Sequence, residues 1–186
     1  MSLKPGQVLK TEAIRGKKVL FRLMRNGDAK KLLAFINPII EEKAYITMNK
    51  KASLSHEQAY IRECVSQLKS RQSLHLVAEC GNKIIAASDL RRHGAPPNNV
   101  DHVAVWGIAV HKDFRNLGLA RNMFQILALA AKKEWRIQIV KSSYFSDNHA
   151  SARLHKKLGF KIVGSIPNGA KAKGKYCDEV IVYKKL

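Results

Sequence analysis

The chain has 186 residues, 46% hydrophobic and 26% charged, a balance typical of one folded globular domain rather than of a disordered chain. Its 34 Lys and Arg residues outnumber 14 Asp and Glu residues, and the resulting net charge of +20 favours anionic partners. No uncharged apolar run reaches the ~18 residues of a membrane-spanning helix, and neither a signal peptide nor a disulfide or zinc pattern is visible. We therefore expect a reduced, cytoplasmic protein without a membrane anchor or a metal.

The first part of the chain predicts a strand followed by a helix. Residues 17–24 are apolar enough for a short strand, and Asn26-Gly27-Asp28 is typical of a turn that starts a helix. Apolar residues at helical spacing follow, and Pro38 should interrupt that helix because it lacks a backbone N–H.

A second helix and a hairpin come next. Ser55 to Gln58 resembles a capping box. The apolar residues behind it recur at i, i+3, i+4 and i+7; they are Ile61, Cys64, Val65 and Leu68. Two strand-like runs, 73–80 and 83–90, are joined by Gly81-Asn82, and a two-residue junction of this kind predicts a β-hairpin.

The second half alternates strands and helices, which favours a mixed α/β sheet. Its predicted strands lie at 101–110, 136–140, 160–165 and 176–184. Its predicted helices begin at Leu119 and near residue 147. Composition predicts loops at 91–99 and at 166–175, the latter basic and rich in glycine.

The most informative stretch is WGIAVHKDFRNLGLAR at 106–121, an apolar strand followed by a turn and a helix start. A helix start exposes unpaired N–H groups and the positive end of the helix dipole, which suits an anion. Gly118 and the small Ala120 would let a pyrophosphate approach closely. Neither of the common glycine-rich nucleotide loops occurs in the chain.

This stretch resembles the acetyl-CoA signature of the GNAT acetyltransferases, a strand ending in G-I-A-V followed by [RQ]-x-x-G-x-[GA]. A second stretch, from Asn148 to Phe160, is similar to the family pattern N-x-x-A-x-x-L-Y-x-x-x-G-F. The resemblance covers about residues 17–185. It implies one GNAT domain over 1–186, with an N-terminal half at 16–110 and a CoA-binding half at 111–186. The implied α/β (α+β) fold has a mixed, largely antiparallel central sheet of about six to seven strands flanked by about four helices.

The resemblance also implies the activity, an acetyl-CoA-dependent N-acetyltransferase in which an amine attacks the thioester directly. Ile108, Ala109 and Val110 would pair with the pantetheine arm, and one of their N–H groups would act as an oxyanion donor. Asn148 would hydrogen-bond the same arm. The other residues implied at the cofactor are Arg115, Asn116, Leu117, Gly118, Leu119, Ala120, Arg121, Ser151 and His155. Lys112 and Lys157 are further candidates for phosphate contacts, with a solvated surface role as the alternative.

The catalytic groups depart from the family pattern. His155 stands where the family usually has an acid tyrosine, and it would serve either as the general acid or as a packing residue against the cofactor. Ser143 replaces a glutamate that relatives often carry, so the base is not identified. Residues that could face the cleft, each with a structural role as the alternative, are Asp89, Asp101, His102 and Tyr144.

Two rival functions stay open. One is a catalytically weak domain that binds CoA and senses it or regulates a partner, which the two departures favour. The other is nucleic-acid binding, which only the charge favours, because no recognisable nucleic-acid motif occurs. The acceptor is a small-molecule or protein amine, and contacts with nucleic acid or the ribosome and a homodimer are left open.

Overall fold

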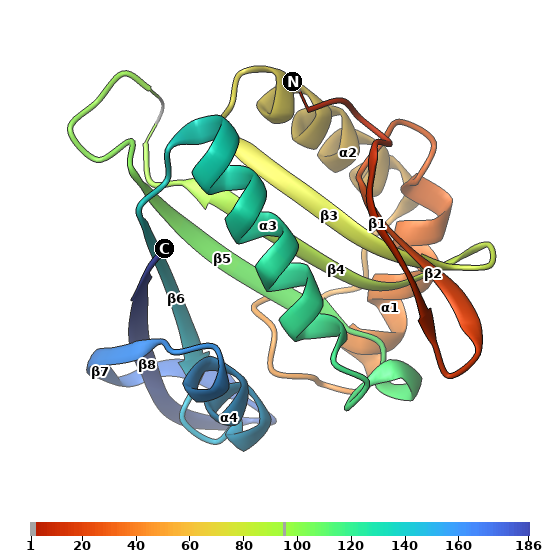
Figure 1. The fold of residues 1–186 in the computed structure, drawn as a ribbon. Helices are drawn as coiled ribbons and strands as arrows, with labels where there is room; N and C mark the ends of the chain where they lie inside the picture. Colours follow the sequence, from red (N-terminus) through yellow and green to blue (C-terminus); the bar gives the residue numbers. More distant parts are fainter. Residues whose placement is uncertain (1–2, 95) are drawn as a thin grey trace.

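The computed structural model describes residues 3–94 and 96–186; Met1, Ser2 and Ala95, the last within the predicted 91–99 loop, lie outside the described residues. Within this part the chain forms one eight-stranded sheet and four α-helices (Figure 1). The strands are β1 (Val8–Ile14), β2 (Lys17–Leu23), β3 (Ser73–Cys80), β4 (Lys83–Arg92), β5 (Val103–Val110), β6 (Ile139–Phe145), β7 (Lys161–Ala172) and β8 (Lys175–Lys185). The helices are α1 (Ala29–Glu41), α2 (Leu54–Lys69), α3 (Leu119–Trp135) and α4 (His149–Lys157), and a 3-10 turn, η1 (Lys112–Phe114), precedes α3.

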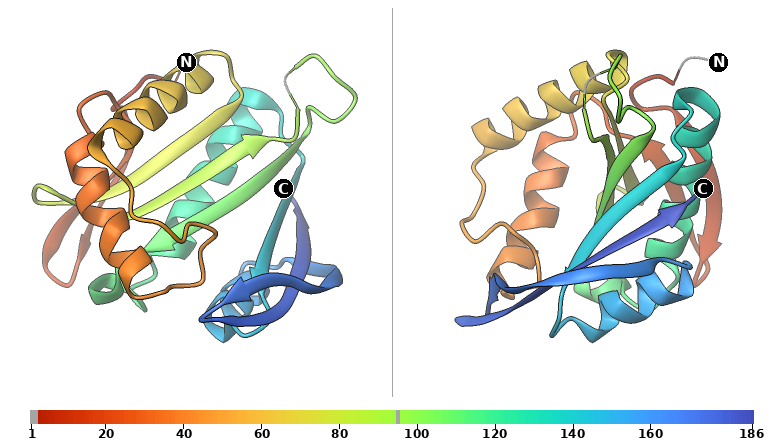
Figure 2. Two further views of the ribbon diagram at one scale, coloured as in Figure 1. Left: turned by 180° about the vertical axis from the view of Figure 1, so that it is seen from behind. Right: turned by 90° about the vertical axis from the view of Figure 1, so that its left-hand side faces the viewer.

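The strands are ordered β1-β2-β3-β4-β5-β6-β8-β7 across the sheet. Every neighbouring pair is antiparallel except β5 and β6, which are parallel. The helices α1 and α2 cover one face, and α3 and α4 cover the other (Figure 2). Each layer has its own core, centred on Trp106 and Leu127 beside α3 and on Phe35 and Ile61 between α1 and α2. The predicted mixed, largely antiparallel sheet is confirmed, although it has one strand more than expected.

The parallel pair at the middle of the sheet is the feature that positions the site. β5 pairs with β6 only over Val103–Val105, opposite Ile139–Lys141. Beyond Val105 the two strands diverge, and Figure 1 shows the gap widening toward the start of α3 and toward α4. The edge of β5 that faces β6 is therefore unpaired from Trp106 onward.

Buried charges fix the start of α1 against the sheet. The guanidinium of Arg22 on β2 donates to both oxygens of Asp28 at 2.7 and 2.8 Å and to Glu79 at 2.6 Å. All three side chains are buried, so each charge depends on the others for its partner. This arrangement holds α1 in the position where it lines the cavity described below.

Two helix predictions are corrected. Pro38 does not interrupt α1, which runs unbroken from Ala29 to Glu41. Pro38 lies in the last turn, where one lost hydrogen bond is offset by the burial of Ile39 and Ile40. The cap of the second helix lies two residues earlier than predicted, because Ser53 rather than Ser55 accepts a hydrogen bond from a first-turn N–H, and the helix begins at Leu54.

The unexpected strand, β1, forms a hairpin with β2. Its turn is Arg15-Gly16, in which both residues have positive φ angles of 50° and 71°. Such turns usually carry Asn or Asp before the glycine, so an arginine there gives no turn signal. The strand is also half exposed and weakly apolar, so its sequence lacks the apolar pattern by which strands are predicted.

Two strand boundaries in the second half are also corrected. The strand predicted at 136–140 begins at Ile139, because α3 extends to Trp135 and ends on Arg136 in a left-handed conformation. The segment 166–175, predicted as a loop, mostly belongs to β7. The ladder is interrupted by a register shift between Ile166 and Ala170, and the residues inside that irregularity have the composition of a loop.

Candidate active site

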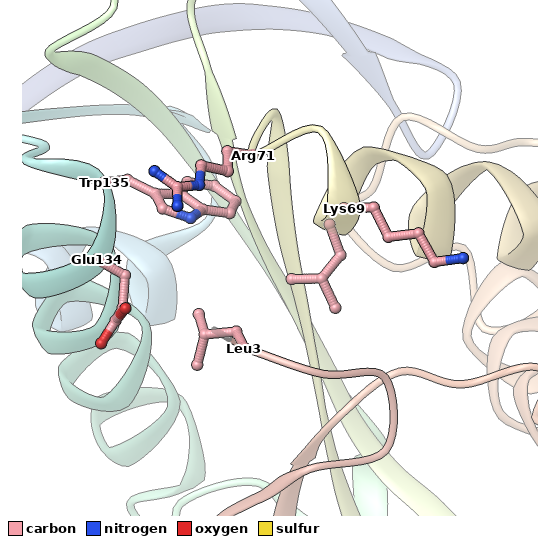
Figure 3. Close-up of a pocket in the computed structure, with 6 residues that line it drawn as sticks. Leu3, Lys69, Arg71, Glu134 and Trp135 are labelled. Carbon is pink, nitrogen blue, oxygen red and sulfur yellow. The ribbon is translucent and has the colours of Figure 1, made fainter. Parts of the chain in front are cut away.

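A cavity of about 880 Å³ opens where β5 and β6 have separated. Its walls come from α1, the segment between α1 and α2, the start of α2, strands β3 to β6, β8 and α4. The segment joining α1 to α2 crosses in front of β5 (Figure 2, left), and its Tyr45 meets Phe145 of β6 edge to face. A second cavity, of about 30 Å³, lies beside Leu3 and Trp135 (Figure 3) and has room for only a few water molecules.

Alternation along β5 decides which backbone groups face the gap. The N–H of His111, just after β5, donates to Ile85 of β4 at 3.0 Å, so odd-numbered residues of β5 direct their backbone groups toward β4. Even-numbered residues point toward β6. Consistent with this, the hydroxyl of Ser142 on β6 lies 3.0 Å from the carbonyl oxygen of Trp106. The last contact across the diverging strands is thus made by a side chain.

Past that point the backbone of β5 is available to a ligand. The backbone N–H and carbonyl of Ile108 and the N–H of Val110 face the gap. The backbone groups of Ala109 point toward β4 instead. The carbonyl of Val110 accepts from Nε of Arg115 at 3.1 Å. Of the three strand residues implied at the pantetheine arm, two are therefore oriented for backbone pairing across the gap, and Ala109 lines the cavity beside them.

The turn after β5 presents the start of α3 to solvent. Asn116 and Gly118 both have positive φ angles, 62° and 76°, and Gly118 is the N-cap residue without a side-chain capping bond. The first N–H groups of α3, from Leu119 to Arg121, precede the first hydrogen bond within the helix, which Asn122 donates to Gly118. Nothing lies within 4 Å of a Cβ atom added at Gly118, so the backbone there is open to an anion.

Arg115 makes specific contacts rather than standing free in solvent. Besides the carbonyl of Val110, its guanidinium forms an ion pair with Glu42, the C-cap residue of α1. It thereby ties the end of α1 to the end of β5. Three other predicted phosphate cations, Lys112, Arg121 and Lys157, are exposed.

Asn148 and Ser151 stand at the start of α4 and both line the cavity. Asn148 is the N-cap residue, and its Oδ1 accepts from the N–H of Ser151 at 3.1 Å. Because capping uses the oxygen, the amide NH2 group of Asn148 is the part that can donate to a ligand.

His155 is buried, with 3% of its surface exposed, and both ring nitrogens are engaged. Nδ1 lies 2.9 Å from the carbonyl oxygen of Ser151, and Nε2 lies 2.9 Å from Oγ of Ser142. The ring also packs among those of Trp106, Tyr144 and Phe160. Burial lowers its pKa, although the hydrogen bond to Ser151 opposes that effect. An imidazole held at both nitrogens in this way is well suited to positioning its neighbours.

Asp89 on β4 points into the cavity against Gly107 of β5. A Cβ atom added to Gly107 would stand 3.0 Å from Oδ1 of Asp89. The other oxygen, Oδ2, is buried and forms an ion pair with Nε of Arg91 at 2.7 Å, but it accepts no hydrogen bond within the described part of the chain. The carboxylate thus lies beside the unpaired end of β5 with hydrogen-bonding capacity unused.

The structure separates the four candidates for the base. Asp89 and Tyr144 line the cavity, and Asp101 and His102 are not among its lining residues. The last two lie just before β5, at the end of that strand where it still pairs with β6. Position in the sheet therefore favours Asp89 and Tyr144.

A further carboxylate, Glu57, lines the cavity and was missed by sequence reasoning. It belongs to the first turn of α2 and has 4% of its surface exposed, and its side chain makes no hydrogen bond or ion pair within residues 3–94 and 96–186. Burial raises the pKa of its carboxyl group, and the nearby His56 partly opposes this. The available signal was its place four residues before Ile61, on the apolar stripe of the helix.

Among the described residues, no three His, Cys, Asp or Glu side chains gather as a metal site would need, and no helix is long and apolar enough to cross a membrane.

A free strand edge next to a large cavity and to a helix start with unpaired N–H groups could hold an extended, phosphate-bearing ligand such as an acyl-CoA. Comparison with known proteins agrees. The family model of the acetyltransferase (GNAT) family matches residues 41–160, and the chain therefore belongs to that family. The predictions of the family, of an acyltransferase and of acetyl-CoA as the family's acyl donor are confirmed.

Individual relatives support the fold. The L-amino acid N-acetyltransferase AaaT of Escherichia coli (strain K12) is 30% identical over 77 residues, which is 41% of this chain and 48% of that protein, so the match spans about half the length of this relative. A ribosomal-protein-alanine N-acetyltransferase from Brucella melitensis has a TM-score of 0.77 at 20% identity, covering 90% of this chain and 99% of the other. The yncA protein of Salmonella typhimurium, solved with acetyl-CoA, has a TM-score of 0.76 at 17% identity, covering 90% and 93%. The GNAT fold is thus confirmed.

Proposed function

We propose that this protein is an acetyl-CoA-dependent N-acetyltransferase acting on a small amine. The observation that carries the proposal is the divergence of β5 from β6 after Val105, because it leaves a strand edge free next to the cavity. The resemblance of the motifs and the family match support the same chemistry. Since the proposed reactive groups line a cavity of about 880 Å³ rather than a flat surface, a small acceptor fits it better than a folded protein surface.

The residues proposed to hold acetyl-CoA lie on three elements. The backbone of Ile108 and Val110 supports pairing with the pantetheine arm, with Ala109 beside it. Asn148 supplies an amide donor from the start of α4, next to Ser151. The turn before α3 offers its N–H groups to the pyrophosphate through Asn116, Leu117, Gly118, Leu119, Ala120 and Arg121. The N–H of Arg115, also expected there from the sequence, already donates to the carbonyl of Lys112 at 3.3 Å. When bound, acetyl-CoA supplies the acetyl group as a thioester that a neutral amine can attack.

Asp89 is the proposed general base. An aliphatic amine has a pKa near ~10.4 and arrives as an ammonium ion at neutral pH, so a proton must leave before attack. Oδ1 of Asp89 accepts that proton, because it faces Gly107 at the start of the free strand edge. An N–H group of Ile108 or Val110 stabilises the oxyanion that develops on the thioester oxygen.

For His155 we propose a positioning role, which differs from both roles predicted from the sequence, the general acid and the residue that packs against the cofactor. It keeps α4 and β6 in place through Ser151 and Ser142, and Ser142 in turn contacts the Trp106 carbonyl at the divergence. Its lowered pKa disfavours the protonated form that a general acid requires.

The test is incubation with acetyl-CoA and a mixed panel of amines, polyamines and peptides, with free thiol and product masses measured. Acetylated amine and stoichiometric thiol release support the proposal. Saturable CoA binding without transfer to any acceptor would instead favour a CoA-sensing domain.

A further inference from the structure

The cavity has the opposite charge balance to the rest of the molecule. Three of the chain's 14 acidic residues line it, and only two of its 34 Lys and Arg residues do. The three are Glu57 on α2, Asp89 on β4 and Glu179 on β8. A protein with a net charge of +20 has thus gathered carboxylates where the acceptor would enter.

The two cations at the cavity are already engaged. Arg91 forms an ion pair with Asp89, and 58% of its side-chain surface is exposed to solvent. Nζ of Lys141 lies 3.3 Å from Nδ1 of His93. Each cation thus already has one partner, although both keep further N–H donors.

Glu57, in contrast, lacks a partner. The residue is largely buried on the core face of α2, where it lines the cavity, and its carboxylate makes no hydrogen bond or ion pair within the described residues. An isolated buried charge is costly, and an ammonium group from a ligand would supply the missing partner. Apolar residues of α1, among them Leu32, Phe35 and Ile36, line the same cavity and suit a chain of methylene groups.

We infer that the acceptor is a small aliphatic diamine or polyamine, whose reacting nitrogen meets Asp89 and whose second, cationic nitrogen binds Glu57. The inference rests on the proposed acetyltransferase function and specifies its substrate class. Two carboxylates on different elements, α2 and β4, bordering one cavity are the arrangement that such a molecule requires.

The test compares three amines that share one reacting end. Butylamine, butane-1,4-diamine and 4-aminobutanoate carry a methyl group, an ammonium group and a carboxylate at the far end. With the unaltered protein and saturating acetyl-CoA, we expect kcat/KM for the diamine to exceed that for butylamine by about tenfold to hundredfold, the effect of one charge-assisted hydrogen bond, with 4-aminobutanoate the poorest.

Glu57→Gln should remove the advantage of the diamine and leave butylamine nearly unchanged. Glu63→Gln is the matched control, because Glu63 lies on the same helix, is exposed, and has a side chain that accepts a hydrogen bond from Gln67. Equal kcat/KM for diamine and butylamine, or a preference for 4-aminobutanoate or peptides, would overturn the inference and leave the acetyltransferase proposal intact. An equal loss for all amines in Glu57→Gln would also overturn it. No transfer to any amine, with CoA still bound, would mean that the proposed function itself is wrong.

Discussion

The carboxylate of Asp89 lies directly against the position that a side chain at residue 107 would take. A Cβ atom added to Gly107 would stand 3.0 Å from Oδ1 of Asp89, so a larger residue at 107 would push the carboxylate from its present position by a few tenths of an ångström. Gly107 directly precedes Ile108, whose backbone faces the gap between β5 and β6. The relationship therefore places a proton acceptor beside the strand edge on which the acyl group is proposed to lie.

Asp89→Asn keeps the size of the side chain but removes its basicity. We expect kcat to fall by about 10²- to 10⁴-fold at pH 7, the usual contribution of a general base. CoA binding, measured by calorimetry, should not change. Asp101→Asn is the control, because Asp101 belongs to the same set of sequence candidates but lies outside the cavity. Normal turnover in Asp89→Asn, or an equal loss in both variants, would exclude Asp89 as the base.

Gly118→Asp should abolish measurable CoA binding, because it adds a side chain and a negative charge at the bare start of α3. A left-handed backbone also strains any side chain, by about 1–3 kcal/mol. Gly16→Asp controls for that strain: Gly16 has a φ of 71° against 76° for Gly118, and an added Cβ has open space at both. Calorimetric titration with CoA distinguishes the two variants. If Gly118→Asp binds CoA as well as Gly16→Asp does, the pyrophosphate is held elsewhere.

His155→Gln tests whether the ring positions its neighbours or donates a proton. The glutamine amide offers both a donor and an acceptor to Ser151 and Ser142, so we expect kcat to fall by less than about tenfold. A general acid would cost about 10²-fold and would remove the alkaline limb of the pH–rate profile. His155→Ala should lose more stability than activity, because it leaves a cavity among three aromatic rings.

Acid should destabilise the fold through two buried histidines. Burial lowers the pKa of both His75 and His155 in the folded state, whereas the unfolded chain titrates near its ordinary value of about 6.5. Below that pH the unfolded state binds protons that the folded state excludes, so the free energy of unfolding falls as pH drops and is recovered above about 6.5. Thermal melts at pH 7.5 and 5.5 measure this contribution. The difference should shrink in His155→Gln, and an unchanged difference would show that His155 does not contribute.

The central elements and the cofactor turn were predictable because their signals are local. The hairpin at Gly81-Asn82, the apolar β5 and the helix from Leu119 follow directly from spacing and turn chemistry. The elements that were missed or shifted depend on distant contacts or unusual turns. Arg15 takes a left-handed backbone conformation, which cannot be predicted from an arginine. Pro38 remains within α1 because the residues that follow it are buried.

In the site, too, local signals were predictable and features that depend on the assembled sheet were not. The motifs identify the backbone that would hold a cofactor, but they do not show which way each backbone group points, and Ala109 turns toward β4 only because of strand register. Asp89 and Asp101 look alike as aspartates near strands, and only the sheet separates them. Glu57 has a sequence signal, a carboxylate on an apolar stripe, yet its lack of a partner is visible only when the surrounding elements are assembled.

The reversal of charge between surface and cavity has a kinetic consequence for the two substrates. CoA is anionic and is attracted by the positive surface, whereas a cationic acceptor is repelled until it reaches the carboxylates inside. Salt screens exposed charges beyond about 8–10 Å at moderate ionic strength but affects buried ones less. Rising ionic strength should therefore slow the capture of CoA and speed that of the amine. When both substrates are scarce, the fastest turnover should occur at an intermediate salt concentration.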